Sequence, residues 1–242
     1  MPLLDFQTAF GRLVRTADGS DPLRSLHLGE AERACIEALP QSAGFRFTVA
    51  VQRSWCARRT VNAGLLALSI LCDDTRRRLL DEWINSGGGT SSFFAAEADA
   101  LLDFIADQLP ETSPELAVCR FEQLTLRASN QVSSFKAPDQ GPLDSQRAVR
   151  RARHAGVVLF HGQPDLILGA LLQRKPLPAV SAEVTALLVA PGLQPLCRIA
   201  SAHEKELWIR LGAPTAVTAL VRDGCPCEVI QTLLHVGALE YA

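Results

Sequence analysis

The chain has 242 residues, 48% of them hydrophobic, and its 24 basic and 26 acidic side chains give a formal net charge of −2. This length is enough for one large domain or two ordinary ones, and the near-neutral charge argues against a general nucleic-acid binder, which needs a basic excess to neutralise phosphate. No run of about twenty uncharged apolar residues could span a membrane, and the N-terminal stretch has no signal-peptide core, so we expect a cytoplasmic protein with no membrane or nucleic-acid partner.

Apolar residues recur at helical spacing through the first part of the chain, which predicts a helical domain over residues 1–130. Within the helix expected at 93–109, Phe94 and Leu101 should face inward. The expected helices cover residues 5–15, 30–39, 45–71, 76–84, 93–109 and 114–129.

The segments between these helices carry turn and capping signals. Residues 21–29 are predicted to be a loop, and the glycine-rich residues 86–92 a flexible connector. A phosphate-binding loop is not expected there, because no lysine follows the glycines and no strand precedes them. Thr112 or Ser113 should cap the last helix, with Pro114 as its first residue.

The composition changes after the helical part. Residues 131–146 are rich in Ser, Gln, Pro, Asp and Gly, which predicts a linker. Residues 147–242 then show short apolar runs at 155–160, 165–172, 184–189 and 195–199. We interpret these runs as a small antiparallel sheet that includes a hairpin at 157–172.

Helical spacing returns at 202–211, 215–221 and 228–236, followed by an extended tail after Gly237. The predicted fold is therefore α+β: a helical N-terminal domain, then a small antiparallel sheet with short helices. The order of elements in the second domain is winged-helix-like, and winged-helix modules bind nucleic acid in some proteins and peptides in others.

No grouping of side chains predicts catalysis or a metal site in this chain. The five histidines are scattered, and the common nucleophile, dinucleotide and zinc-protease motifs are not present. The seven cysteines fit a reducing compartment, and only Cys225 and Cys227 are close together. Since a stable soft-metal site needs further ligands, we expect no catalytic residue, no bound metal and no cofactor.

Two arginine-rich segments are candidate binding surfaces. In the predicted helix at 45–71, the residues proposed to bind a partner protein are Arg53, Trp55, Arg58 and Arg59, because Arg and Trp are enriched at binding hot spots. The alternative is a core tryptophan whose neighbouring arginines pair with acids of another helix, such as Glu122. The second segment, RAVRRARH at 147–154, could meet nucleic acid, an acidic peptide or a partner protein.

Four segments together resemble the MbnC family: LDFQTAFGRLVR (4–15), VQRSWCARR (51–59), CRFEQLTLRAS (119–129) and LLHVGALE (233–240). The resemblance implies the partner protein of an MbnB-like multinuclear iron oxidase in methanobactin biosynthesis, or of a similar peptide-modifying iron enzyme. Such an oxidase uses dioxygen to convert cysteines of an MbnA-like precursor into oxazolone and thioamide groups of a copper-chelating peptide. The implied role is a non-catalytic subunit of a heterodimer that binds the precursor's leader, with the iron held by the partner.

An open sheet edge would suit an extended leader peptide. We expect that edge on the strand at 193–200, with the last helix as the opposite wall, although the predicted hairpin at 157–172 also has an edge and the same residues could simply form a core. The residues proposed to bind the peptide are Leu193, Leu196, Arg198, Ile199, Ile230, Leu233 and Leu234.

The main alternative function is a winged-helix transcriptional regulator with a helical sensing domain. It predicts a basic recognition helix, but residues 228–236 contain no Lys or Arg. We therefore expect negligible DNA binding at physiological salt. A purely structural adaptor that never touches the peptide is a further alternative.

Overall fold

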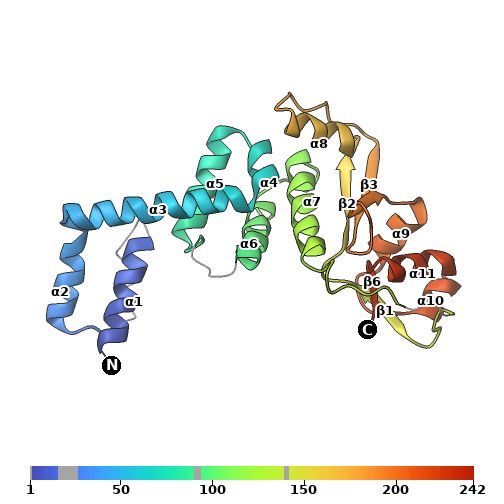
Figure 1. Cartoon of the computed structure of the whole chain (residues 1–242), viewed down its shortest axis with the longest axis horizontal. Helices are drawn as coiled ribbons and strands as arrows, with labels where there is room; N and C mark the ends of the chain where they lie inside the picture. The colour runs from blue at the N-terminus through green and yellow to red at the C-terminus, as the bar shows by residue number, and fades with distance from the viewer. Residues whose placement is uncertain (1, 16–26, 90–93, 139–141) are drawn as a thin grey trace. The chain divides into compact units, whose positions relative to one another are not determined.

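The computed structural model describes residues 2–15, 27–89, 94–138 and 142–242 (Figure 1). The chain is α+β, as expected: helices come first, and two small three-stranded antiparallel sheets with short helices follow. It divides into two compact units, residues 1–104 and 105–242. The predicted linker, 131–146, lies inside the second unit, and its role as a domain boundary stays a prediction. Parts of the predicted loop at 21–29 and connector at 86–92 lie outside the described residues.

The first unit is built from helices. They are α1 (Pro2–Arg15), α2 (Glu30–Ala38), the 3-10 helix η1 (Leu39–Gln41), α3 (Ala43–Ala63), α4 (Leu65–Ile70), α5 (Asp73–Asn85) and the greater part of α6 (Phe94–Ala106). One small core joins α1, α2 and the start of α3, and includes Leu13, Ile36 and Phe45. The other end of α3 lies beside α4 and α5 (Figure 1).

Two expectations for these helices are wrong in detail. The helix predicted at 45–71 is interrupted at Gly64, which separates α3 from α4 with φ −130° and ψ 58°. A Cβ at Gly64 would lie 3.3 Å from Leu101 Cδ2 and 3.5 Å from Leu102 Cδ2, so the missing side chain lets α6 approach closely. Leu101 is buried as expected, but Phe94 is 44% exposed because it lies at the first residue of α6.

The second unit begins with the end of α6 and with α7 (Pro114–Ser129), whose bounds match the prediction. The Ser113 hydroxyl accepts the N–H of Leu116 at 3.1 Å, which is the expected cap. The elements that follow are β1 (Ala148–Arg151), β2 (Gly156–His161), α8 (Pro164–Leu172), β3 (Val184–Val189), β4 (Cys197–Ile199), α9 (Ala202–Arg210), β5 (Thr215–Ala216), α10 (Val217–Arg222), α11 (Cys227–His235) and β6 (Leu239–Tyr241).

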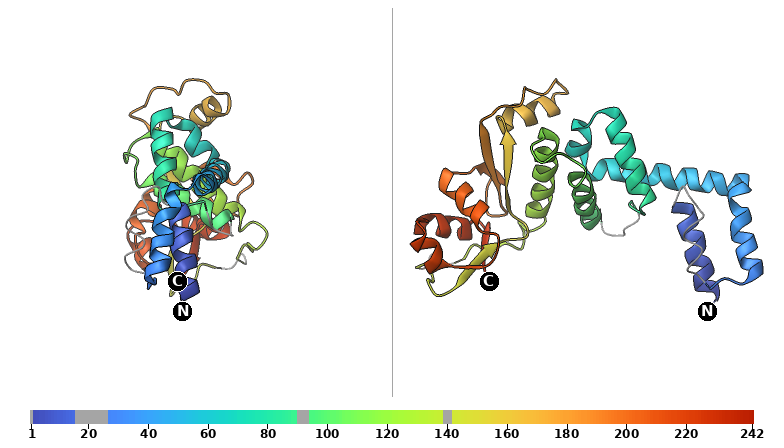
Figure 2. Two further views of the ribbon diagram at one scale, coloured as in Figure 1. Left: turned by 90° about the vertical axis from the view of Figure 1, so that its left-hand side faces the viewer. Right: turned by 180° about the vertical axis from the view of Figure 1, so that it is seen from behind.

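The strands form two sheets, in the orders β5-β1-β6 and β2-β3-β4, and all their pairs are antiparallel. Helix α7 covers one face of β2 and β3, where the rings of Phe121 and Phe160 meet edge-on at 6.3 Å between centroids (Figures 1 and 2). The opposite face of that sheet joins β1, β6 and the last three helices in one core. Its buried members include Val149, Leu188, Leu207, Leu220, Ile230, Leu233 and Leu239.

The predicted hairpin at 157–172 is wrong. Residues 165–172 belong to α8, with Pro164 at its first position, and β2 pairs with β3 from Gly156↔Val189 to His161↔Val184. A short apolar run does not distinguish a strand from a buried helix by its periodicity. The proline before Asp165 was the overlooked signal, because proline is favoured in the first turn of a helix.

Strand β1 was missed, since it is rich in arginine. The extended tail expected after Gly237 contains β6, which pairs with β1 across about ninety residues. The strand expected at 195–199 is confirmed at Cys197–Ile199. Among the described helices, none combines the length and the apolar character that crossing a membrane would require.

Candidate functional site

The arginines proposed to bind a partner are largely engaged within the first unit. Arg53 donates to Asp81 Oδ1 at 2.9 Å and to Asn85 Oδ1 at 2.6 Å, both on α5. Arg59 Nε donates to Glu97 Oε2 at 2.6 Å, and the Glu97 side chain on α6 is only 6% exposed. The alternative interpretation, arginines paired with acids of neighbouring helices, therefore holds for these two, with Asp81 and Glu97 as the acids.

Trp55, in contrast, is not a core residue, because it is 51% exposed. The Arg59 guanidinium lies 5.3 Å from the Trp55 ring centroid and 5.7 Å from that of Phe94. Since the ion pair with buried Glu97 fixes this guanidinium, it holds both exposed rings through cation–π contacts. Two half-exposed aromatic rings are thus presented in a fixed arrangement.

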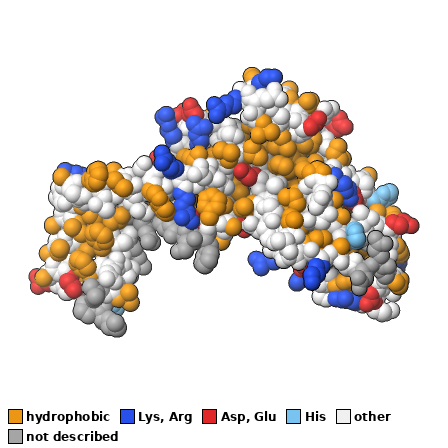
Figure 3. Space-filling model, in the orientation of Figure 1, with side chains coloured by type: hydrophobic (Ala, Val, Ile, Leu, Met, Phe, Trp, Pro, Cys, Tyr) orange, Lys and Arg blue, Asp and Glu red, His pale blue; other side chains and the backbone are white. Residues whose placement is uncertain are grey.

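These rings adjoin an exposed stripe on α3. Phe47, Val51 and Trp55 are spaced four residues apart, lie on one side of the helix, and are each at least half exposed. Arg58 continues this side, is exposed, and has no ion pair within the described part of the chain. We call Phe47, Val51, Trp55 and Arg58 the α3 face; Figure 3 shows hydrophobic and basic side chains next to each other over this part of the first unit. A surface of this composition suits a protein partner.

The residues proposed to bind a peptide fall into two groups, one on strand β4 at the edge of its sheet and the other mostly facing the core. Strand β4 ends its sheet. The amide of Ala200 donates to Ala186 O of β3 at 2.8 Å, so the backbone of Arg198, two residues away, also points to β3. The N–H and C=O groups of Cys197 and Ile199 therefore point outward, and the Ile199 side chain is 66% exposed.

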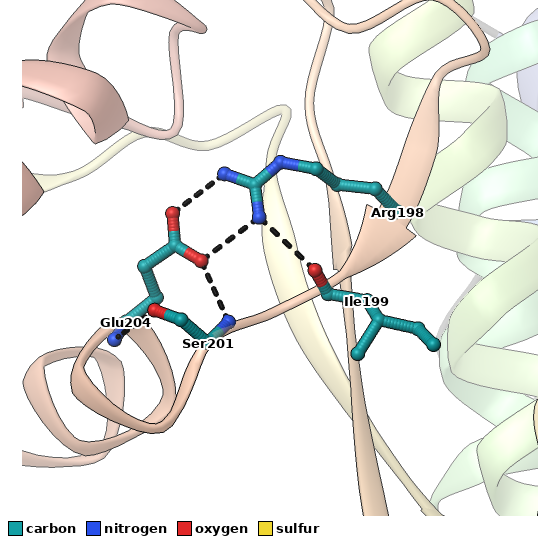
Figure 4. Close-up of polar contacts among 4 residues, drawn as sticks. All are labelled: Arg198, Ile199, Ser201 and Glu204. Carbon is teal, nitrogen blue, oxygen red and sulfur yellow. Dashed lines mark hydrogen bonds and ion pairs between the residues drawn. The ribbon is translucent and has the colours of Figure 1, made fainter.

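A polar cluster fixes this strand to the start of α9 (Figure 4). Arg198 binds both carboxylate oxygens of Glu204, at 2.8 and 2.6 Å, and also donates to Ile199 O at 3.0 Å. Glu204 accepts the Ser201 amide at 2.8 Å, and its own amide donates to the Ser201 hydroxyl at 3.2 Å, which forms a capping box. The hydrogen bonds from Arg198 lower the pKa of the Glu204 carboxyl, although burial opposes the shift.

The polar cluster occupies part of the outer edge of β4 and leaves only a short stretch of its backbone for a ligand. Because the Ile199 carbonyl already accepts from Arg198, the outward groups open to a ligand are the N–H and C=O of Cys197 and the N–H of Ile199. We call this stretch the β4 edge.

The other proposed peptide-binding residues mostly face the core. Leu193 and Leu196 lie in the turn before β4 and are partly buried. On α11, Ile230 and Leu233 are fully buried and Leu234 is 6% exposed, so the apolar wall expected from this helix is covered by the unit's own residues. Which residues contact a peptide stays a prediction.

Sequence reasoning did not assign Glu97, Phe94 or Glu204 to a site. Of the three, only Glu204 could have been identified from the sequence, because Ser201 and Glu204 have the spacing of a capping box. Glu97 and Phe94 meet Arg59 only through the packing of α6 on α3.

Cys225 and Cys227 are both free thiols, and burial raises the pKa of Cys225. Within the residues that the structure describes, no group of three or more His, Cys, Asp or Glu side chains could hold a metal ion. The chain matches no protein-family model and no curated protein.

Proposed function

We propose that the chain is the non-catalytic subunit of a heterodimeric peptide-modifying iron oxidase, as its resemblance to the MbnC family implies. In this proposal an MbnB-like partner holds the iron, and this chain binds the leader of an MbnA-like precursor whose cysteines become oxazolone and thioamide. The observation that carries it is the β4 edge: outward backbone groups of Cys197 and Ile199 on an edge strand that the Arg198–Glu204 pair holds in place.

The leader would bind by adding a strand. An extended peptide beside β4 satisfies the outward groups of Cys197 and Ile199, and backbone pairing of this kind demands little of the peptide's sequence. The exposed Ile199 side chain supplies an apolar contact. The other outer strand of the same sheet, β2, is the alternative place for such a strand.

We also infer a winged-helix-like arrangement in the second unit. Helices α9, α10 and α11 follow one another with β5 between the first two, and β6 follows the last helix. Strand β1, from earlier in the chain, lies between β5 and β6 and completes the small sheet. A winged-helix transcriptional regulator would have the same arrangement. The side chains on the surface of α11 therefore have to distinguish a regulator from a peptide-binding subunit.

That surface argues against DNA. The exposed side chains of α11 include Glu228, Gln231, Thr232 and His235, and no Lys or Arg occurs on the helix. A helix that binds the phosphate backbone of DNA needs cationic side chains. A specific mobility shift with promoter DNA at about 0.15 M salt would favour the regulator over our proposal.

The peptide site can be tested with a proline at Cys197. Cys197→Pro removes an outward N–H from an edge strand, where proline is tolerated. We expect the affinity for a fluorescent precursor leader to fall by about three- to tenfold in an anisotropy titration, as the loss of one net hydrogen bond implies. Cys197→Ala is the control, because it removes the thiol and keeps the amide. Unchanged affinity in a folded proline variant would show that the leader binds elsewhere.

The partner site can be tested on the α3 face. Truncating a central aromatic anchor typically costs 2 kcal/mol or more, so Trp55→Ala should weaken oxidase binding by at least about thirtyfold and abolish co-purification. Leu172→Ala is the control, since Leu172 is 75% exposed and lies on α8. Equal co-purification of both variants would refute the α3 face as the partner site. Iron-dependent dioxygen uptake by the purified chain alone would refute the non-catalytic role.

A further inference from the structure

Helix α8 is apolar on all sides but is not buried. Asp165 is the only polar residue of Pro164–Leu172, and a helix of this composition normally lies inside a core. Only Pro164 and Ile167 of this helix are buried, and Figure 3 shows hydrophobic side chains gathered over it. An exposed apolar surface of this kind is typical of a site where a protein binds.

The uncovered side of α8 is centred on Gly169. With 3.6 residues per turn, Gly169 lies about 200° round the helix from the buried Ile167. Leu166 and Leu172 lie about 60° to either side of Gly169, and about 4.5 Å before and after it along the helix axis. The two leucines are 54% and 75% exposed. We call Leu166, Gly169 and Leu172 the α8 patch.

Gly169 leaves a notch in the middle of this patch. A Cβ built there would meet no described atom within 4 Å, and the backbone is not in the left-handed region, so the fold of this chain does not require glycine at the position. Glycine inside a helix is also less stable than alanine. The missing side chain does allow another backbone to approach closely. The notch between the two exposed leucines therefore suits a second helix.

The patch is complementary to a copy of itself. In an antiparallel pair of α8 helices related by a twofold axis beside Gly169, residues equally far before and after Gly169 lie at the same height. Leu166 of each copy then packs beside Leu172 of the other. The two glycines face each other where the helices are closest, so the leucines interdigitate around them.

The charges at the two ends of α8 match the same arrangement. From 162 to 182 the charged residues are Asp165, near the start of the helix, and Arg174 and Lys175, just after its end. All three are exposed, and within the described residues none has an ion pair, including with Glu183, the next charged residue along the chain. An antiparallel copy places Asp165 of each chain at the basic end of the other, so opposite charges meet twice.

We propose that the α8 patch is a self-association surface, on which a second copy of this chain binds antiparallel about a twofold axis beside Gly169. The partner is a second copy because the leucines and the end charges are both self-complementary, as a twofold interface requires. Since the nine residues of α8 are fewer than the roughly 20–30 per side of a standard interface, we expect a dissociation constant on the order of 10–100 µM. The proposal goes beyond leader and oxidase binding and does not depend on them, because α8 belongs to neither the β4 edge nor the α3 face.

Sedimentation equilibrium of the full-length chain tests the proposal, at concentrations below and above the expected dissociation constant. A reductant excludes disulfide-linked dimers through the exposed thiols of Cys35, Cys72 and Cys227. We expect the average mass to rise with concentration from that of the 26.2 kDa chain towards twice this value. A monomer at every concentration would overturn the proposal.

Charge reversal tests the antiparallel arrangement. Asp165→Lys, and the double variant Arg174→Glu with Lys175→Glu, should each weaken the dimer by about tenfold, because like charges then meet at both ends. Mixing the two variant proteins should restore association as a heterodimer, since each chain again offers the charge that the other lacks. Unchanged association of the separate variants, or no recovery on mixing, would contradict the arrangement. Loss of oxidase co-purification with no change in mass would assign the patch to the oxidase and would equally refute self-association.

Gly169→Ala separates association from folding. Alanine is the better helix former, so the variant should be at least as stable as the wild-type chain in urea unfolding. The dimer should nevertheless be at least about fivefold weaker, because the two added Cβ atoms meet where the helices are closest. Gly212→Ala is the matched control, since Gly212 also has no described atom near its Cβ position and lies outside α8. Equal association of the two variants would rule out the close approach at Gly169.

Discussion

Replacing Gly237 with alanine should lower the free energy of unfolding of the second unit by about 3 kcal/mol. Gly237 has φ +73°, a left-handed conformation that costs other residues about 1–2 kcal/mol. The new Cβ would also lie 2.4 Å from Phe135 Cε2, and relieving such an overpacked contact costs a further 1–3 kcal/mol or so. Urea unfolding followed by circular dichroism measures the sum.

Two variants separate the causes. Gly224 has φ +89° and no atom near its Cβ position, so Gly224→Ala should cost only the conformational part, about 1–2 kcal/mol. In a Phe135→Ala background, Gly237→Ala should also cost only that part, because the ring is gone. Equal losses for Gly237→Ala with and without the ring would show that a Cβ added at Gly237 does not meet Phe135.

Arg198→Ala should destabilise the second unit by about 2 kcal/mol. The substitution leaves the carboxylate of Glu204, which is 4% exposed, without its charged partner. Removing one member of a fully buried pair costs about 3–5 kcal/mol, and the partial exposure of Arg198 reduces this. Arg210→Ala is the matched control on α9, since its pair with Glu206 is exposed and should contribute less than about 0.5 kcal/mol. Similar losses for both variants would contradict the structural role given to the buried pair.

The same pair predicts a pH dependence. The hydrogen bonds from Arg198 lower the pKa of Glu204 in the folded chain, so this carboxylate stabilises the fold above its unfolded pKa of about 4.3. That stabilisation is lost as the pH falls through the lower folded pKa. Urea unfolding between about pH 6 and pH 3 should therefore show a shallower decline for Glu204→Gln than for the wild-type chain. Parallel declines would show that Glu204 contributes nothing to the acid sensitivity.

The sequence determined the features that depend on neighbours along the chain. Helix α7 begins where Ser113 and Pro114 indicate, because a capping hydroxyl and a first-turn proline act within a few residues. The α+β order followed from apolar spacing in the same way. Where the local signal was ambiguous, as in the short apolar run that became α8, the prediction of a strand was wrong.

Only the tertiary structure decided which surfaces are open. The pairing of β1 with β6 joins residues about ninety positions apart and makes β6 an outer strand of its sheet. Packing of α6 on α3 turned Arg59 from a candidate contact into the support of Trp55 and Phe94. The physical reason is common to these cases: burial and strand pairing depend on segments that meet only in the folded chain, and residue type and spacing do not specify which segments meet.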